Sequence, residues 1–254
     1  MKRQMMRLRG VAGSVLLLLG ACQSPVFAPM PQVEHKTPAE MYSDPKVVEL
    51  VEAIVARDPQ RIAELAKQGA NVNANPTDGV VPLLWASEVR CNACIATLLK
   101  AGADPWMKMD VTGESAVEMI LERRDRSAEQ LPVFLGAGLD PNHPVSKITD
   151  VSLLGIASFH GPLEIVKRLV AAGAEVNFHP GGDFQNVLDR ALDGGRFDVA
   201  YYLLEHGYQP NLEELARGVQ ASHVDPAHEP ERQRVIAWLK ARGVNYPPDP
   251  TSDP

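Results

Sequence analysis

The sequence lacks the motifs that mark several common classes of enzyme. It contains no HExxH, GxSxG or phosphate-binding loop, and no two of its seven histidines stand at the i, i+4 spacing of a helical zinc site. His223 and His228, with Asp225 and Glu229, could gather a metal, but a polar surface loop has the same composition far more often. We therefore expect a protein that is not an enzyme and that holds no metal or cofactor.

Apolar runs of bilayer length are also missing at the start of the chain. The apolar stretch from Val11 to Leu19 is about half of the roughly 20 residues that a membrane-spanning helix needs. It follows a basic opening segment without acidic residues, which is the layout of a secretory signal peptide. Residues 1–21 are therefore predicted to be a signal peptide that is removed.

The end of this stretch, Leu19-Gly20-Ala21-Cys22, resembles the lipobox of bacterial lipoproteins. The resemblance implies cleavage before Cys22 and acylation of that cysteine, and more than one acyl chain gives stable anchoring. In such lipoproteins an Asp after the cysteine tends to retain the protein in the inner membrane, whereas this chain has Gln23. We expect a lipid anchor in the outer membrane, with the protein facing the periplasm.

Positive charge is scarce in the expected mature chain. Removal of residues 1–21 leaves 21 Lys and Arg against 32 Asp and Glu, a net charge of −11 with neutral histidines. A nucleic-acid partner becomes improbable, because phosphate binding needs the opposite sign. An acidic surface favours a basic partner or simply solubility.

Cysteine is rare, and only Cys91 and Cys94 remain once Cys22 is lipidated. Two thiols at this spacing could pair in an oxidising compartment, and the same spacing occurs in redox motifs. A redox motif is expected beside a strand-helix-strand pattern, which is not visible here. Cys94 also fits an apolar core position of a helix, so structural or idle thiols are the favoured interpretation.

The two ends of the chain differ in composition from its middle. Residues 22–45 contain five prolines without helical periodicity and are predicted to be an extended tether. Residues 246–254 are rich in proline and are predicted to be a disordered tail. The folded domain is expected over residues 46–245.

Within that domain one glycine-centred phrase recurs at a period of 33 to 36 residues. A period of this length is typical of stacked repeats. Each glycine follows an apolar helical stretch and is suited to the left-handed position that ends a helix. The glycines are Gly69, Gly102, Gly138, Gly173, Gly207 and Gly243.

Phrases between these glycines resemble the ankyrin repeat. Gly79-Val-Val-Pro-Leu-Leu-Trp-Ala-Ser87 is similar to the ankyrin Gly-x-Thr-Pro-Leu-His-x-Ala-Ala, and residues 152–166 match the longer pattern through both helices. The resemblance implies an all-α ankyrin-repeat solenoid of about five to six repeats. The ankyrin histidine is replaced in every full repeat, by Leu84, Glu118, Gly155 and Asp189, so its turn hydrogen bond should be missing and stability should come from stacking.

Ankyrin repeats bind other proteins through hairpin tips and the ends of their first helices. Mapped onto this chain, Phe159 and Phe184 are candidate aromatic anchors, Trp106 is a further contact, and Trp85 is assigned to the core. The complete set of predicted partner-binding residues is Thr77, Asp78, Val80, Glu88, Val89, Trp106, Val111, Thr112, Glu114, Arg123, Ile148, Thr149, Val151, Phe159, His160, Asp183, Phe184, Gln185 and Asp193.

The resemblance and the anchor together imply a membrane-tethered protein-binding module that is monomeric when free. Ankyrin-type lipoproteins of this size resemble immunity proteins against type VI secreted phospholipase effectors, which implies a secreted lipase as partner. The alternative is an ankyrin lipoprotein that supports envelope or oxidative-stress defence by binding a host periplasmic enzyme. A redox protein using Cys91 and Cys94 is a third hypothesis.

Overall fold

The protein is mostly helical, which confirms the predicted all-α class. The computed structural model describes residues 37–76, 79–110, 112–145, 151–178, 186–224 and 226–248, apart from the side chains of residues 124 and 125. These ranges contain thirteen α-helices, one 3-10 helix and, as their only β-type pairing, an isolated bridge between Lys108 and Ser115. The helices are α1 (Pro38–Met41), α2 (Pro45–Val55), α3 (Pro59–Lys67), α4 (Pro82–Glu88), α5 (Asn92–Lys100), α6 (Ala116–Glu122), α7 (Arg124–Gly136), α8 (Leu153–His160), α9 (Leu163–Ala171), α10 (Val187–Asp193), α11 (Phe197–Glu205), α12 (Leu212–Ala221), η2 (Pro226–His228) and α13 (Glu229–Lys240).

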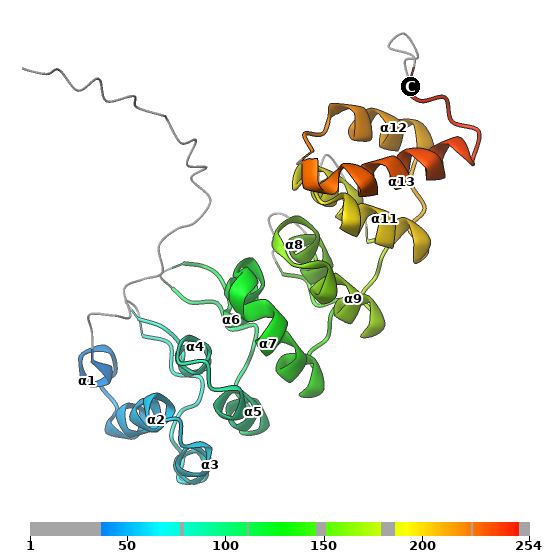
Figure 1. The fold of residues 1–254 in the computed structure, drawn as a ribbon. Coiled ribbons are helices and arrows are strands. Elements are labelled where there is room, and N and C mark those ends of the chain that lie inside the picture. The colour runs from blue at the N-terminus through cyan, green and yellow to red at the C-terminus, as the bar shows by residue number, and fades with distance from the viewer. Residues whose placement is uncertain are drawn as a thin grey trace, which may run out of the picture. The chain divides into compact units, whose positions relative to one another are not determined.

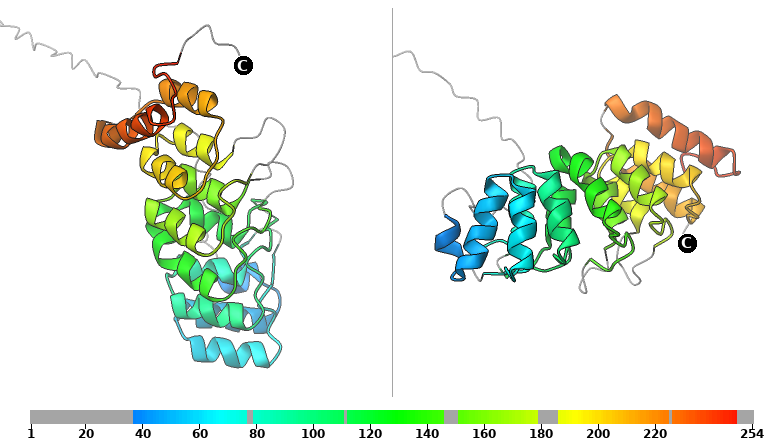
Figure 2. Two further views of the ribbon diagram at one scale, coloured as in Figure 1. Left: turned by 90° about the vertical axis from the view of Figure 1, so that its right-hand side faces the viewer. Right: turned by 90° about the horizontal axis from the view of Figure 1, so that it is seen from below.

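From α2 onward the helices pack as successive pairs (Figure 1). The two members of each pair contact one another, as α4 does α5 and α8 does α9. Each helix also contacts the helix two places further along the chain, so α2, α4, α6, α8, α10 and α12 form one row and α3, α5, α7, α9, α11 and α13 form another (Figures 1 and 2). We call these the first-helix row and the second-helix row.

The six periodic glycines end the second helices, as predicted. Their φ values lie between 84° and 96°, a left-handed conformation that residues with a Cβ adopt only at a cost. After Gly102, for example, the amide of Ala103 donates a hydrogen bond of 2.9 Å to the carbonyl of Leu98 and closes the helix end. The recurring glycine therefore marks the end of each unit.

Asparagines four residues after a glycine link one unit to the next. Asn142 donates from Nδ2 to the Gly173 carbonyl at 2.9 Å and accepts from the Glu175 amide at 2.8 Å. Asn177 repeats both bonds with Gly207 and Gln209, and Asn73 makes them with Gly102 and Asp104. The equivalent position after Gly102 is Trp106, which stacks on His143 with ring centroids 4.3 Å apart.

The core lies between the two rows of helices. Leu98 of α5, Leu154 of α8 and Phe197 of α11 are fully buried, and Trp85 is only 7% exposed, which agrees with its predicted place in the core. Among the described residues the only large hydrophobic side chain classed as exposed is Val55, at 48%. Because a single pair of helices has too little apolar surface to bury alone, stacking supplies most of the stability.

Two of the residues at the positions predicted to correspond to the ankyrin histidine form local hydrogen bonds of their own. The buried carboxylate of Glu118 accepts hydrogen bonds from the Ser115 amide at 2.7 Å and from the Ser115 hydroxyl at 2.6 Å. The same carboxylate also pairs with Lys108. Asp189 accepts from Asn186 Nδ2 at 2.7 Å. The expected loss of stabilising bonds at the start of the first helix is therefore offset in these two units.

The predicted boundary between tether and domain is wrong. Pro38–Met41 forms a helix that packs against α2, and Met41 and Tyr42 are buried. The Tyr42 hydroxyl donates a hydrogen bond to the Val80 carbonyl and accepts one from Trp85 Nε1. Together with the burial of Met41 and Tyr42, these bonds make residues 38–45 part of the folded domain. The signal peptide, Cys22 and tether residues 22–36 lie outside the described residues.

The opposite end also extends further than predicted. Tyr246 accepts a hydrogen bond of 3.2 Å from Arg232 of α13, whereas residues 249–254 lie outside the described residues. None of the described helices is both long and apolar enough to cross a bilayer.

Cys91 and Cys94 form a disulfide, the pairing that the sequence left open, so they are structural rather than idle cysteines. Cys91 is the N-cap of α5, where its sulfur accepts from the Cys94 amide at 3.1 Å. Cys94 is fully buried and Cys91 is 7% exposed. The cross-link therefore sits at the start of a second helix, within one unit of the stack.

Candidate functional site

Six of the predicted partner-binding residues occupy the same place in four successive first helices. Each lies at the last turn or the C-cap of α4, α6, α8 or α10, and these helices contact one another in order. We define them as the helix-end surface. It consists of Glu88, Val89, Arg123, Phe159, His160 and Asp193, all of which are partly or fully exposed.

Glu88 is the centre of an ion-pair network at the end of α4. Its carboxylate pairs with Arg126 at 2.6 Å and with Arg123 at 3.7 Å. The side chain of Glu88 is only 19% exposed, so the three charges form a network more shielded than an ordinary surface pair. Sequence reasoning missed Arg126, because it lies in α7, a second helix, and reaches the surface only through the direct junction of α6 and α7 at Arg123.

Phe159 lies beneath an arginine of the next unit. The Arg190 guanidinium is centred 5.6 Å from the Phe159 ring, and its Nε donates to the Gly155 carbonyl at 3.1 Å. The ring of His160 meets Phe159 edge-on at 4.4 Å. Phe159 therefore both packs on the adjacent unit and stays partly exposed.

Gly155 makes room for this arginine. A Cβ at residue 155 would lie 3.3 Å from Arg190 Cδ and 3.4 Å from a methyl of Val151. Gly155 stands where the ankyrin pattern has histidine. The departure from the pattern was visible in the sequence, but the arginine that uses the space comes from the following unit and was missed.

Glu122, in the last turn of α6, is affected by two other carboxylates of its unit. Burial, reinforced by the charges of Glu114 and Glu118, raises the pKa of Glu122 to about 7. Burial and the charge of Glu118 also raise the pKa of Glu114 above its usual range. Burial lowers the pKa of Arg190, against the opposing effects of Asp193 and Glu122. Glu122 and Arg190 therefore lie in one poorly solvated patch.

The remaining predicted contacts fall into three groups. Val80 is fully buried, so its prediction as a partner contact is wrong, and its carbonyl accepts a hydrogen bond from the buried Tyr42 hydroxyl. Trp106, Thr112, Glu114 and Val151 are partly exposed. Eight residues lie outside the described residues, namely Thr77, Asp78, Val111, Ile148, Thr149, Asp183, Phe184 and Gln185.

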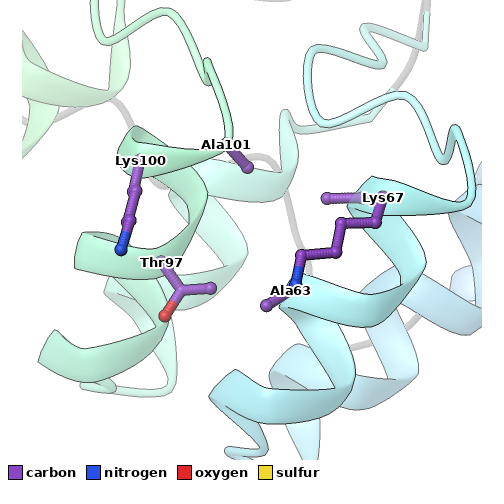
Figure 3. A pocket seen from close by; sticks show the side chains of 6 residues that line it. Ala63, Lys67, Thr97, Lys100 and Ala101 are labelled. Carbon is purple, nitrogen blue, oxygen red and sulfur yellow. The ribbon is translucent and has the colours of Figure 1, made fainter.

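A separate groove lies on the second-helix row. Ala63 and Lys67 of α3 face Thr97 and Lys100 of α5 across it (Figure 3). It is open and lined mainly by small residues, and it contains none of the predicted contacts. It provides a control surface for experiments on the helix-end surface.

Nothing in the described residues resembles a metal centre. No three His, Cys, Asp or Glu side chains gather there as ligands, and His223 and His228 line a polar depression with Asp193, Arg196 and Asp198. No protein-family model and no curated protein matches this chain. What the helix-end surface offers a ligand is a shielded ion network at the end of α4 and a partly exposed aromatic ring at the end of α8, features typical of contacts between proteins.

Proposed function

We propose that this chain is an ankyrin-type protein-binding module. The period of 33 to 36 residues, the left-handed glycine after each second helix and the asparagine bonds between units support this assignment. In such a stack the core fixes the inward residues, and the helix ends are left to vary with the partner.

The observation that carries the proposal is the helix-end surface itself. Four units present partly exposed charged or aromatic side chains at the same structural position, although no core requirement selects them. Phe159 serves as the anchor in this proposal, because aromatic residues ringed by shielded polar groups contribute most to protein interfaces. The net charge of −11 that the chain would have after removal of residues 1–21 favours fast association with a basic partner.

The specific form of the proposal is an immunity protein. The lipobox at Cys22 would tether the module to the outer membrane on its periplasmic side. There it would bind a secreted phospholipase in an equimolar complex, cover its active-site entrance and prevent lipid hydrolysis. The module itself would perform no chemistry.

The disulfide has a structural role in this proposal. Cys94 has no exposed surface, and exchange with another protein's thiol needs access to a sulfur. A variant with both cysteines replaced by serine is expected to retain partner binding. Loss of binding with unchanged helical content would instead favour the redox hypothesis.

The test is capture from periplasm under non-reducing conditions, followed by titration of the captured enzyme's lipid hydrolysis with the purified full chain. We expect inhibition that is complete near one equivalent. Phe159→Ala should weaken binding by about 2 kcal/mol or more. The matched control is Tyr202→Ala, which removes a partly exposed aromatic side chain from α11 in the second-helix row.

Two outcomes would count against the proposal. Hydrolysis that continues at excess protein would exclude the immunity function, and a captured host enzyme that is not a lipase would favour the role in envelope defence. Equal weakening by Phe159→Ala and Tyr202→Ala would show that the helix-end surface is not the contact.

A further inference from the structure

Arg190 is held in place by contacts that leave part of its guanidinium unused. Its Nε donates to the Gly155 carbonyl at 3.1 Å, and its Cζ lies over the Phe159 ring, 5.6 Å from the ring centroid. Gly155 permits this position, because a Cβ there would press on Arg190 Cδ at 3.3 Å. The side chain is thus oriented by the neighbouring unit before any ligand arrives.

Within the part of the chain that the structure describes, the two terminal nitrogens of Arg190 have no acceptor. Among the described residues no carboxylate lies within 4.0 Å of them and no oxygen accepts a hydrogen bond from them, although Asp193 and Glu122 act on the arginine from further away. Neighbouring cations differ: Arg123 and Arg126 share Glu88, and Lys108 pairs with Glu118. Arg190 is therefore a partly buried arginine whose terminal donors are not used by any of the described residues.

A guanidinium with both terminal nitrogens available offers parallel N–H donors that match the two oxygens of a carboxylate. Burial also lowers the pKa of Arg190, so an incoming anion would stabilise its charged form. A phosphate would bring about two negative charges towards Glu122 and Asp193, whereas a carboxylate brings one. The surroundings therefore favour the side chain of an aspartate or glutamate.

We infer that Arg190 binds an acidic side chain of the partner protein at the helix-end surface. Phe159 packs against the guanidinium, and the absence of a Cβ at Gly155 leaves room for the arginine side chain. The inference rests on the proposed function, and it adds to it the class of residue that the partner must present. Negative charge elsewhere on the module attracts a basic partner. The contact between Arg190 and one acidic side chain of that partner then determines how the partner is positioned on the surface.

The first test needs no partner. The full chain is labelled with ¹⁵N-arginine, and the Arg190 Nε signal is assigned by its absence in Arg190→Lys. N-acetyl-glutamate N-methylamide is then titrated against its neutral glutamine counterpart and against inorganic phosphate. We expect a saturable shift of the Arg190 signal with the carboxylate, none with the amide, and a weaker response to phosphate. Arg242, which stacks on Trp238, serves as the internal control.

Gly155→Ala tests positioning separately from charge. It keeps the arginine but crowds its Cδ, so the carboxylate response should fall at least several-fold while the helical content stays the same. No shift at Arg190, an equal shift at Arg242, or an unchanged response in Gly155→Ala would overturn the inference. A response to phosphate as strong as that to carboxylate would overturn the choice of a protein side chain.

The second test uses the captured partner and separates this inference from the proposed function. Arg190→Gln should weaken binding at least tenfold, whereas Lys100→Gln in the groove of Figure 3 should leave it unchanged. If Arg190→Gln binds the partner with the same affinity as the wild type, the inference is contradicted, whereas the proposed function is not. A specific carboxylate response without any captured partner would support the inference and count against the proposed function.

Discussion

Two kinds of junction join neighbouring units of this protein, and they use different chemistry at the same position. After Gly138 and Gly173 an asparagine bridges to the next unit with two hydrogen bonds. After Gly102 the corresponding residue is Trp106, which stacks on His143. The described residues show no side-chain hydrogen bond to the Gly138 carbonyl.

The difference shows which part of a repeat is interchangeable. Both junctions lie on continuous rows of helices with buried apolar side chains, so the core bears most of the free energy of unfolding. The polar bridge adds alignment and can be replaced by ring stacking. The unit that begins after Trp106 also contains Glu114 and Glu122, whose pKa values are raised by burial, so the exceptional junction adjoins these two carboxylates.

The largest expected effect comes from the core that both junctions share. Leu154→Ala removes a fully buried side chain of α8 and should lower the free energy of unfolding by about 2 to 5 kcal/mol. Urea denaturation followed by circular dichroism measures it. A midpoint unchanged within error would show that α8 contributes no buried surface between units.

Removing an asparagine bridge should cost less. Asn142→Ala deletes two exposed hydrogen bonds and should lower the free energy of unfolding by about 1 to 2 kcal/mol. Asn245→Ala, at an exposed position without a bridging bond, is the control and should have almost no effect. Equal midpoints for the two variants would mean that the bridges do not stabilise the stack.

Replacing the ring stack at Trp106 by an asparagine tests whether the two kinds of junction are interchangeable. Trp106→Ala removes the stack on His143 and should cost about 0.5 to 1.5 kcal/mol. Trp106→Asn should cost about 1 kcal/mol less, because the new amide can bridge to the Gly138 carbonyl as Asn142 does to Gly173. If the two variants unfold together, the geometry of this junction excludes the bridge.

The smallest effect concerns the carboxylate patch and depends on pH. A carboxyl whose folded pKa is raised to about 7 is mostly neutral in both states at about pH 4, and its charge destabilises the fold increasingly as pH rises through the interval between its usual value and 7. Glu122→Gln should therefore stabilise the protein above pH 7 by less than about 1 kcal/mol after screening by water.

Denaturation of Glu122→Gln at about pH 4 and about pH 8 checks the sign. The gain should appear only at the higher pH, and Glu205→Gln, at an exposed position of α11, should show no such difference. A gain at both pH values would point to a change in packing rather than in charge.

The comparison also explains how much the sequence could reveal. The periodic glycines predicted where second helices end, because a left-handed position strongly favours glycine. The same register placed six of the predicted contact residues on one surface. Arg190 and Arg126 were missed, since each reaches this surface from another helix and no local pattern encodes such contacts.

The predictions for Val80 and for the start of the domain were wrong for a different reason. Tyr42 and Met41 are buried by contacts with residues about 40 positions away, such as the bond from Tyr42 to Val80, and proline content alone suggested an extended tether. Local composition predicts conformation, whereas burial depends on which distant surface is available to cover a side chain.

Protection in living cells tests the proposed binding surface most directly. A strain without this gene is mixed with neighbours that deliver the phospholipase, and it is complemented with the wild type, Phe159→Ala or Tyr202→Ala at equal protein levels. We expect survival with the wild type and with Tyr202→Ala, and killing with Phe159→Ala. Equal survival with and without the gene, or full protection by Phe159→Ala, would contradict a protective role for the helix-end surface.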